Sequence, residues 1–160
     1  MRKKFFALLL LPFLSHAKSS DYVVGAGLSA DNNHILGGSS KETYMLRAGI
    51  INNDTHRFLG TVTYSSESKL TKYLGSYDYM YGLGSSGKLN TFIGISVGYK
   101  SQDIDTPDNN SFYLFGGQAG VNYFFSESWS TELGYRVLSG STQEDEWMKD
   151  ELYMTLDYRF

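Results

Sequence analysis

The chain has 160 residues, a formal net charge of −3 and no cysteine. The lack of cysteine excludes a disulfide scaffold, a thiolate nucleophile, a thiolate metal site and a lipid-modified N-terminal cysteine. The charge balance also lacks the basic excess typical of nucleic-acid-binding domains, so we expect no nucleic acid partner.

The N-terminus is typical of an export signal. Residues 2–4 are basic, residues 5–14 (FFALLLLPFL) form a short apolar run, and a small residue, Ala17, follows at a position that signal peptidase reads. This run of 10 residues is about half the length that a membrane-spanning helix needs. We therefore predict a cleaved signal peptide at 1–17 and a single mature domain at 18–160, with 11 basic and 17 acidic residues.

After the signal, the chain alternates between apolar and polar residues in eight segments. The segments are residues 22–30, 42–51, 57–65, 72–82, 89–100, 112–123, 129–138 and 151–160. The clearest alternation lies in residues 89–100, where Ile93 and Ile95 share one face and Gly94 and Ser96 share the other. A period of two indicates β-strands with two different faces.

The last segment shows which solvents these faces meet. Leu152, Met154, Leu156, Tyr158 and Phe160 lie on one face and run to the end of the chain. Such a strand is typical of the closing strand of a membrane β-barrel, with lipid outside and a polar lumen inside. The alternative is a soluble β-sandwich or lipocalin-like barrel, which would turn the tyrosine-rich face inward and bury hydroxyl groups, an unfavourable arrangement.

The connections between segments alternate in length. The short ones are residues 52–55, 83–88 and 124–128, the longer ones are residues 31–41, 101–111 and 139–148, and residues 66–71 are intermediate. With an even number of strands, this pattern places both termini in the periplasm and the longer loops outside the cell. We predict an all-β fold, an eight-stranded antiparallel transmembrane β-barrel with an up-and-down meander.

On this parity, twelve of the thirteen tyrosines face outward, and Tyr153 is the exception. Outward aromatic rings favour the interface between head groups and acyl chains, so we predict two aromatic belts. The belt residues are Tyr22, Tyr81, Tyr123 and Trp129 near the periplasmic ends, and Tyr64, Tyr73, Tyr99 and Tyr113 near the outer ends.

Charged residues also occur with inward parity. The predicted polar network of the lumen consists of Arg47, Asp78, Glu132, Arg136, Asp157 and Arg159, and Lys72 and Lys100 share this parity. The interior of an eight-stranded barrel is only wide enough for side chains to fill, so opposite charges can pair there as a plug. A gated or leaky narrow pore is the alternative. We expect Ile95→Arg to disrupt the lipid face and Ser96→Arg, facing the lumen, to be milder.

Other side chains that could carry chemistry give weak signals. His34 and His56 fall at opposite ends of the barrel, which excludes a two-histidine metal site. Acidic clusters at residues 103–108 and 144–151 are expected to form a solvated rim, although carboxylates near lipopolysaccharide could also share divalent cations. Trp147, within the second cluster, is a candidate for contact with a partner. We predict no catalytic residue, no metal site and no cofactor.

Two segments resemble a known family. Residues 116–136 (GGQAGVNYFFSESWSTELGYR) resemble the penultimate hairpin of small outer-membrane barrels of the OmpA transmembrane domain, OmpX and opacity-protein kind. The ending Tyr158-Arg159-Phe160 is similar to the C-terminal signal that the barrel-assembly machinery reads in that superfamily. The resemblance implies the outer membrane of a Gram-negative bacterium, with Tyr158 and Phe160 as the assembly signal.

The resemblance also implies partners: outer-membrane lipid and lipopolysaccharide, and during biogenesis periplasmic chaperones and the barrel-assembly machinery. We expect a non-enzymatic barrel with a filled lumen and a structural or surface-interaction role, including adhesion or colonisation through a host-surface ligand of the extracellular loops. The alternatives are a narrow porin-like channel and a lipid A-modifying barrel enzyme.

Overall fold

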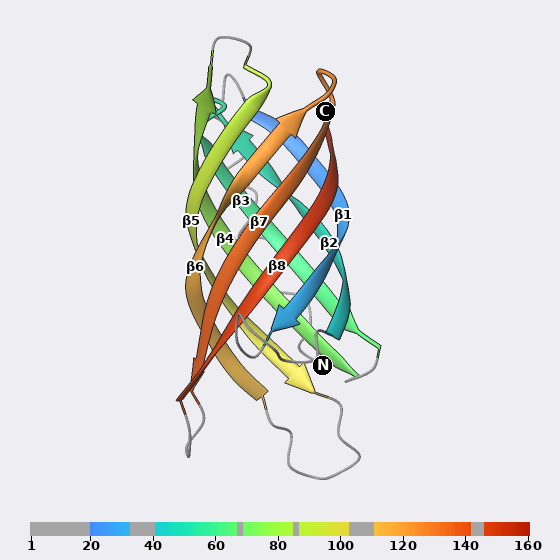
Figure 1. Cartoon of the computed structure of the whole chain (residues 1–160), viewed down its shortest axis with the longest axis vertical. Helices are drawn as coiled ribbons and strands as arrows, with labels where there is room; N and C mark the ends of the chain where they lie inside the picture. Colours follow the sequence, from blue (N-terminus) through green and yellow to red (C-terminus); the bar gives the residue numbers. More distant parts are fainter. Residues whose placement is uncertain (1–19, 33–40, 67–68, 85–86, 103–110, 142–145) are drawn as a thin grey trace, which may run out of the picture.

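The described residues form a closed barrel of eight antiparallel strands in sequence order, so the predicted fold is confirmed (Figure 1). The computed structural model describes residues 20–32, 41–66, 69–84, 87–102, 111–141 and 146–160. The strands are β1 (Ser20–Asn32), β2 (Lys41–Asn52), β3 (His56–Ser65), β4 (Leu70–Leu83), β5 (Leu89–Gln102), β6 (Ser111–Phe124), β7 (Trp129–Ser141) and β8 (Glu146–Arg159). No helix in these ranges is long and apolar enough to cross a membrane.

Pairing of β1 with β8 closes the sheet. Following the paired residues once around the barrel from Tyr22 leads to Asn32, ten residues further along the same strand. A stagger of this kind tilts the strands by roughly 35–45° from the barrel axis and fixes the barrel width. The first and last described residues lie at one end of the barrel, which we call the terminal end; the opposite end is the loop end (Figure 1).

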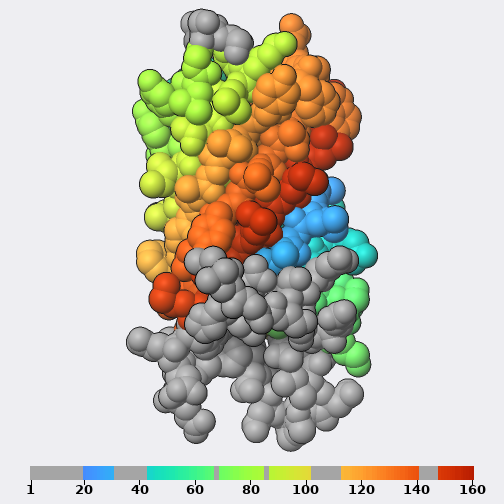
Figure 2. All heavy atoms as spheres, viewed as in Figure 1, coloured from blue at the N-terminus to red at the C-terminus, as the bar shows by residue number. Residues whose placement is uncertain are grey.

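Exposure alternates along every strand with the parity that the sequence predicts. In β3, for example, buried and exposed residues alternate from Arg57 to Ser65. The exposed face carries large apolar side chains, such as Leu46 and Ile93, which are 66% and 67% exposed. Figure 2 shows one face of this outer wall, where side chains of successive strands lie against one another. The inward face is rich in polar and charged groups, and Tyr153, the predicted exception among the tyrosines, is 1% exposed there.

Inward-facing glycines make room for the larger interior side chains. A Cβ atom at Gly25 would collide with the Asp157 carboxylate, and one at Gly134 would collide with the ring of Tyr153. Each close approach places a large side chain across the backbone of the neighbouring strand. The interior is therefore packed with little free space around these groups.

Most strands extend further than the sequence predicts. The loop predicted at residues 139–148 is wrong in its bounds, because residues 139–141 belong to β7 and residues 146–148 belong to β8. The backbone hydrogen-bond ladder continues past the apolar band, where polar residues no longer alternate clearly. Except for β3, the strands have 12 to 14 residues, and they are therefore longer than the segments of alternating hydropathy in the sequence.

Candidate functional site: the ion-paired barrel interior

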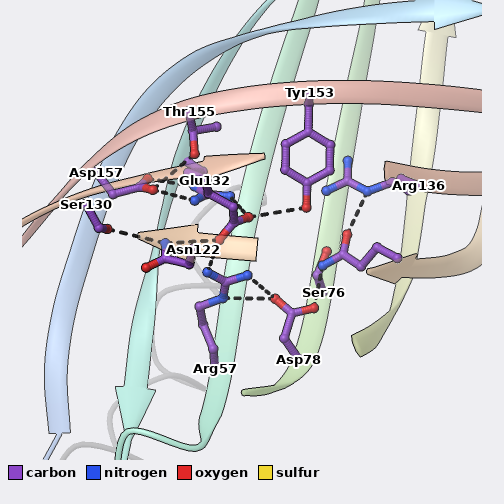
Figure 3. Close-up of polar contacts among 12 residues, drawn as sticks. Arg57, Ser76, Asp78, Asn122, Ser130, Glu132, Arg136, Tyr153, Thr155 and Asp157 are labelled. Carbon is purple, nitrogen blue, oxygen red and sulfur yellow. Dashed lines mark hydrogen bonds and ion pairs between the residues drawn. The ribbon is translucent and has the colours of Figure 1, made fainter. Parts of the chain in front are cut away.

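Two arginines share one carboxylate at the centre of the interior. Arg47 on β2 donates to both oxygens of Asp157, at 2.7 and 2.5 Å, and its Nη1 lies 2.6 Å from Glu132 Oε1. Arg57 on β3 pairs with Asp78, with Nη2 to Oδ2 at 2.8 Å, and its Nη1 donates to the second oxygen of Glu132. All five side chains are at most 3% exposed. We call these five residues the central cluster (Figure 3).

Neutral side chains extend the network toward the loop end. Gln118 Nε2 donates to Asp78 at 2.5 Å, while Gln118 Oε1 accepts hydrogen bonds from Arg136 Nε at 2.7 Å and Ser96 Oγ at 2.9 Å. The hydroxyl of Ser96 also lies 2.9 Å from that of Ser76. Gln118 therefore connects Arg136 to the central cluster without a direct ion pair.

A second set of charges lies nearer the loop end. Lys72 Nζ is 3.1 Å from Glu151 Oε2, and Arg136 Nη1 is 3.8 Å from the same oxygen. The Arg136 guanidinium lies over the ring of Tyr153, at 4.9 Å from its centroid, and the Tyr153 hydroxyl donates to Glu132 at 3.3 Å. Tyr153 thus contacts both charged sets (Figure 3).

Arg159 occupies a different place from the other predicted network residues. It lies at the terminal end, where its Nε donates to Asp21 at 2.5 Å and its Nη2 pairs with Asp54. Its side chain is 25% exposed, whereas those of Arg47 and Arg136 are almost fully buried. Arg159 also borders a cavity of about 990 Å³ at this end, together with Lys88 and Asn90.

The buried charges of the described interior are nearly balanced. The cations are Arg47, Arg57, Lys72, Lys100 and Arg136, and the carboxylates are Asp78, Glu132, Glu151 and Asp157. Removing one partner of a buried ion pair leaves the other charge without compensation, so the groups stabilise the closed interior only as a set. Arginine forks bound to carboxylates in two-point contacts also fix geometry. Opposite charges therefore pair across the barrel interior, which is the arrangement predicted from the sequence for a plug.

Two of these buried charged residues, Arg57 and Glu151, are absent from the network that the sequence predicts. Arg57 follows the short turn before β3, yet it shares the inward face of Thr61 and Thr63, so parity could have identified it. Glu151 is predicted in the solvated acidic rim, and this is wrong: it lies in β8 and is 2% exposed. Its neighbour Asp150 is only half-buried, so the acidic run at this point divides between the two faces of the strand.

The predicted belt residues are all exposed on the outer wall. Near the loop end, Tyr73 pairs with Tyr99 across β4 and β5, and Tyr99 pairs with Tyr113 across β5 and β6. At the terminal end, the ring of Trp129 lies 5.0 Å from that of Tyr158. The remaining belt residues in the prediction are Tyr22, Tyr64, Tyr81 and Tyr123.

The residues of the predicted assembly signal form the seam of the barrel. The backbone N–H groups of Tyr22 and Phe160 each donate to the other residue's carbonyl at 3.0 Å. The Phe160 ring stacks on those of Tyr22 and Tyr158, with centroids 5.9 and 6.0 Å away. In the closed barrel these two aromatic residues are therefore engaged with β1.

Other predicted features lie partly outside the described residues. His34 and residues 103–108 fall outside them, and the backbone of Trp147 lies in β8 while its side chain is not described. His56 is described, and its Nδ1 shares a hydrogen bond of 2.8 Å with the Tyr77 hydroxyl. Within the described part of the chain, no group of three or more histidine, aspartate or glutamate side chains could hold a metal ion.

The fold is that of a small transmembrane β-barrel. Among solved structures, the chain is similar to outer membrane protein H (OprH) of P. aeruginosa, with 23% identity, a TM-score of 0.72 and coverage of 88% of this chain and 99% of that one. It is also similar to Neisserial surface protein A (NspA), with 18% identity, a TM-score of 0.61 and coverage of 88% and 97%. The chain therefore has the fold of the small eight-stranded outer-membrane barrels.

A designed protein without a natural function has the same fold. A de novo transmembrane β-barrel matches with 11% identity, a TM-score of 0.61 and coverage of 88% of this chain and 95% of that one. No family model matches the chain. No curated protein matches it either. Because a designed barrel shares the architecture, the fold by itself assigns no biological task.

Proposed function

We propose that this chain is an integral outer-membrane β-barrel protein of a Gram-negative bacterium, exported by a cleaved signal peptide at 1–17. In this proposal the terminal end faces the periplasm and the loop end faces the outside of the cell. The barrel is non-enzymatic, and it acts in envelope structure and surface contact.

One observation carries the proposal: the polarity of the barrel is the reverse of that of a soluble protein. Large apolar side chains cover the outer wall, while arginines and carboxylates that are almost fully buried fill the interior. An exposed apolar surface of this extent would drive a soluble protein to aggregate. In a bilayer the same surface contacts acyl chains, and the closed sheet leaves no strand edge unpaired.

The proposed membrane location has a direct test. Membrane fractionation should recover the chain in the outer membrane, and unboiled samples should migrate differently from boiled samples on a gel because the folded barrel resists detergent. A mature chain that stays dissolved without detergent, with its tyrosines shielded from quenchers, would overturn the proposal.

The surface role rests on the loops between strands at the loop end. We propose a host-surface ligand, with adhesion or colonisation as the outcome. Replacing residues 142–145 with a Gly-Ser linker should reduce binding of expressing cells to host matrix, because this connection joins β7 to β8 at the proposed outer end. The matched control replaces the turn at residues 125–128 at the opposite end. Equal binding by both variants contradicts the surface role.

A narrow channel is the second candidate function. The cavity of about 990 Å³ at the terminal end would give ions access to the interior from one side, and the ion-paired central cluster would be the gate. Single-channel recordings in planar bilayers distinguish a channel from a structural barrel, since a plugged interior conducts no steady current.

A lipid A-modifying activity is tested by comparing lipid A mass spectra with and without expression.

A further inference from the structure

An apolar groove crosses the outer wall of the barrel over β2, β3, β4 and β5. Its volume is about 470 Å³. The floor of the groove contains Gly60 and Gly75, which are directly paired across β3 and β4 and both face outward. A Cβ atom at Gly60 would meet only a backbone oxygen at 3.8 Å, and one at Gly75 only a backbone oxygen at 4.0 Å. Any larger residue here would therefore fill the groove.

The walls of this outer groove are branched and aromatic side chains. Ile50, Phe58, Tyr77 and Ile95 form one paired row across the four strands on the terminal side of the glycines, with the Phe58 and Tyr77 rings 5.1 Å apart. Val97 lies beside Gly75 on β5. Phe58 and Ile95 are each 54% exposed, so they rise above the glycine floor. Walls and floor of this kind offer dispersion contacts along their length to one extended hydrocarbon chain.

A polar side chain, His56, lies beyond the terminal side of the groove, next to Tyr77. His56 begins β3 at the terminal end, and its Nδ1 shares the 2.8 Å hydrogen bond with the hydroxyl of Tyr77, a wall residue. The imidazole stacks on Tyr77 at 6.0 Å and meets the ring of Tyr79 edge-on at 5.7 Å. With Nδ1 engaged, Nε2 is the nitrogen that can donate to an anionic oxygen. Along β3 the outer surface therefore changes from apolar at Gly60 to hydrogen-bonding at His56.

We propose that the outer groove, together with His56, binds a single glycerophospholipid, with one acyl chain over Gly60 and Gly75 and the headgroup phosphate beside His56. This inference rests on the proposed membrane location, which puts His56 at the level of the periplasmic leaflet. A phospholipid has both the chain that the groove matches and the phosphate that the neighbouring His56 matches. The groove is continuous with the lipid-facing wall, so a lipid reaches it by lateral diffusion.

The test counts lipids on the intact mature barrel. The chain is folded into vesicles of phosphatidylethanolamine and phosphatidylglycerol, extracted into a mild detergent and measured by native mass spectrometry. The wild type should keep a peak with one bound phospholipid. Gly60→Leu with Gly75→Leu should lose this peak, because two leucines occupy the groove. Gly117→Leu is the matched control, since Gly117 also faces outward, with its nearest backbone oxygen 3.7 Å from an added Cβ, and it does not line the groove.

A second arm tests the role of His56. In vesicles doped with diacylglycerol, which lacks the phosphate, the wild type should keep phospholipid in preference to diacylglycerol. His56→Phe, which retains an aromatic ring, should lose that preference. If His56→Phe prefers phospholipid as strongly as the wild type does, the assignment of the headgroup is overturned.

Two further outcomes overturn the proposal. Equal lipid retention by the wild type, the groove variant and the Gly117 variant would mean that the lipid is a general annulus. A peak of two chains that the groove variant abolishes would mean that a second copy occupies the groove. The gel shift of unboiled samples is recorded for each variant, so a barrel that never enters the membrane counts against the proposed function and not against the groove alone.

Discussion

Arg47 and Glu132 are 85 residues apart in the sequence, and inside the barrel Arg47 Nη1 lies 2.6 Å from Glu132 Oε1. Glu132 also pairs with Arg57, so one carboxylate from β7 joins two cations from β2 and β3. Because the three strands are not neighbours in a single hairpin, this contact forms only when the barrel is closed. The central cluster therefore couples the ion pairs of the interior to closure of the sheet.

Glu132→Gln should destabilise the folded barrel by about 3–5 kcal/mol, because it leaves two buried guanidinium groups without their shared anion. Urea titration in detergent micelles, followed by the gel shift of unboiled samples, measures this change. Glu127→Gln is the control, since Glu127 is exposed in the turn between β6 and β7. A Glu132 variant as stable as the control would mean that the cluster contributes little to stability.

Gly134→Ala should destabilise the barrel by about 1–3 kcal/mol through overpacking, because its Cβ would enter the space of the Tyr153 ring. The same titration measures the effect. At Gly117, where an added Cβ would make only an ordinary contact of 3.7 Å with a backbone oxygen, Ala should be neutral or slightly stabilising. Similar effects at the two glycines would contradict the tight approach of Tyr153 to β7.

Ile95→Arg should cost about 2–4 kcal/mol, because Ile95 lies midway along β5 on the lipid face. Leu89→Arg, on the same face at the terminal end of the same strand, should cost only about 0–1 kcal/mol, since the penalty falls toward the interfaces. Folding titrations in vesicles compare the two. Equal penalties would show that the outer face does not lie in a bilayer.

Ser96→Arg tests how tightly the lumen is filled. The sequence alone predicts that this change is milder than Ile95→Arg, because Ser96 faces the polar side. In the structure Ser96 is fully buried, and its hydroxyl group contacts the Ser76 hydroxyl and the side-chain amide oxygen of Gln118. We now expect Ser96→Arg to reduce the yield of folded barrel at least as much as Ile95→Arg, measured by the gel shift. A normal yield would reveal spare room in the interior.

Deleting Phe160 should slow assembly in cells, because it removes the two backbone hydrogen bonds with Tyr22 and the stacked rings at the seam. Pulse-chase labelling with the gel shift as readout follows the rate. Phe125→Ala removes another exposed ring at the terminal end and should leave the rate unchanged. An unaltered rate after deletion of Phe160 would count against its role as an assembly signal.

Alternation predicts the number of strands and the face of each residue, because a strand repeats every two residues whatever its neighbours are. The order of the strands in a meander needs the lengths of the connections as well. The period of two even identifies Tyr153 as the inward tyrosine. Parity does not identify which charges meet. Arg47 reaches Asp157 and Glu132, from β8 and β7, because the stagger of the closed sheet brings their side chains to one level of the lumen.

The sequence is least informative where the apolar alternation ends. Glu151 follows a run of acidic residues and resembles part of a loop, and its burial depends on Lys72 of β4, 79 residues away. Arg159 has inward parity, but parity carries no information on depth, and at the terminal end its partners are Asp21 and Asp54. The outer groove depends on two glycines, Gly60 and Gly75, that only the register of β3 and β4 places side by side.

The mutual hydrogen bonds of Tyr22 and Phe160 bring the start of β1 and the end of β8 within reach of a short covalent bridge. In the closed sheet the pair of β1 and β8 is hydrogen-bonded like every other pair of neighbouring strands. The chain could therefore begin at another strand without loss of any strand pair. A circular permutant that joins these ends and opens the chain at the turn between β4 and β5 would keep every pair of neighbouring strands, and only the order in which the strands are synthesised would change.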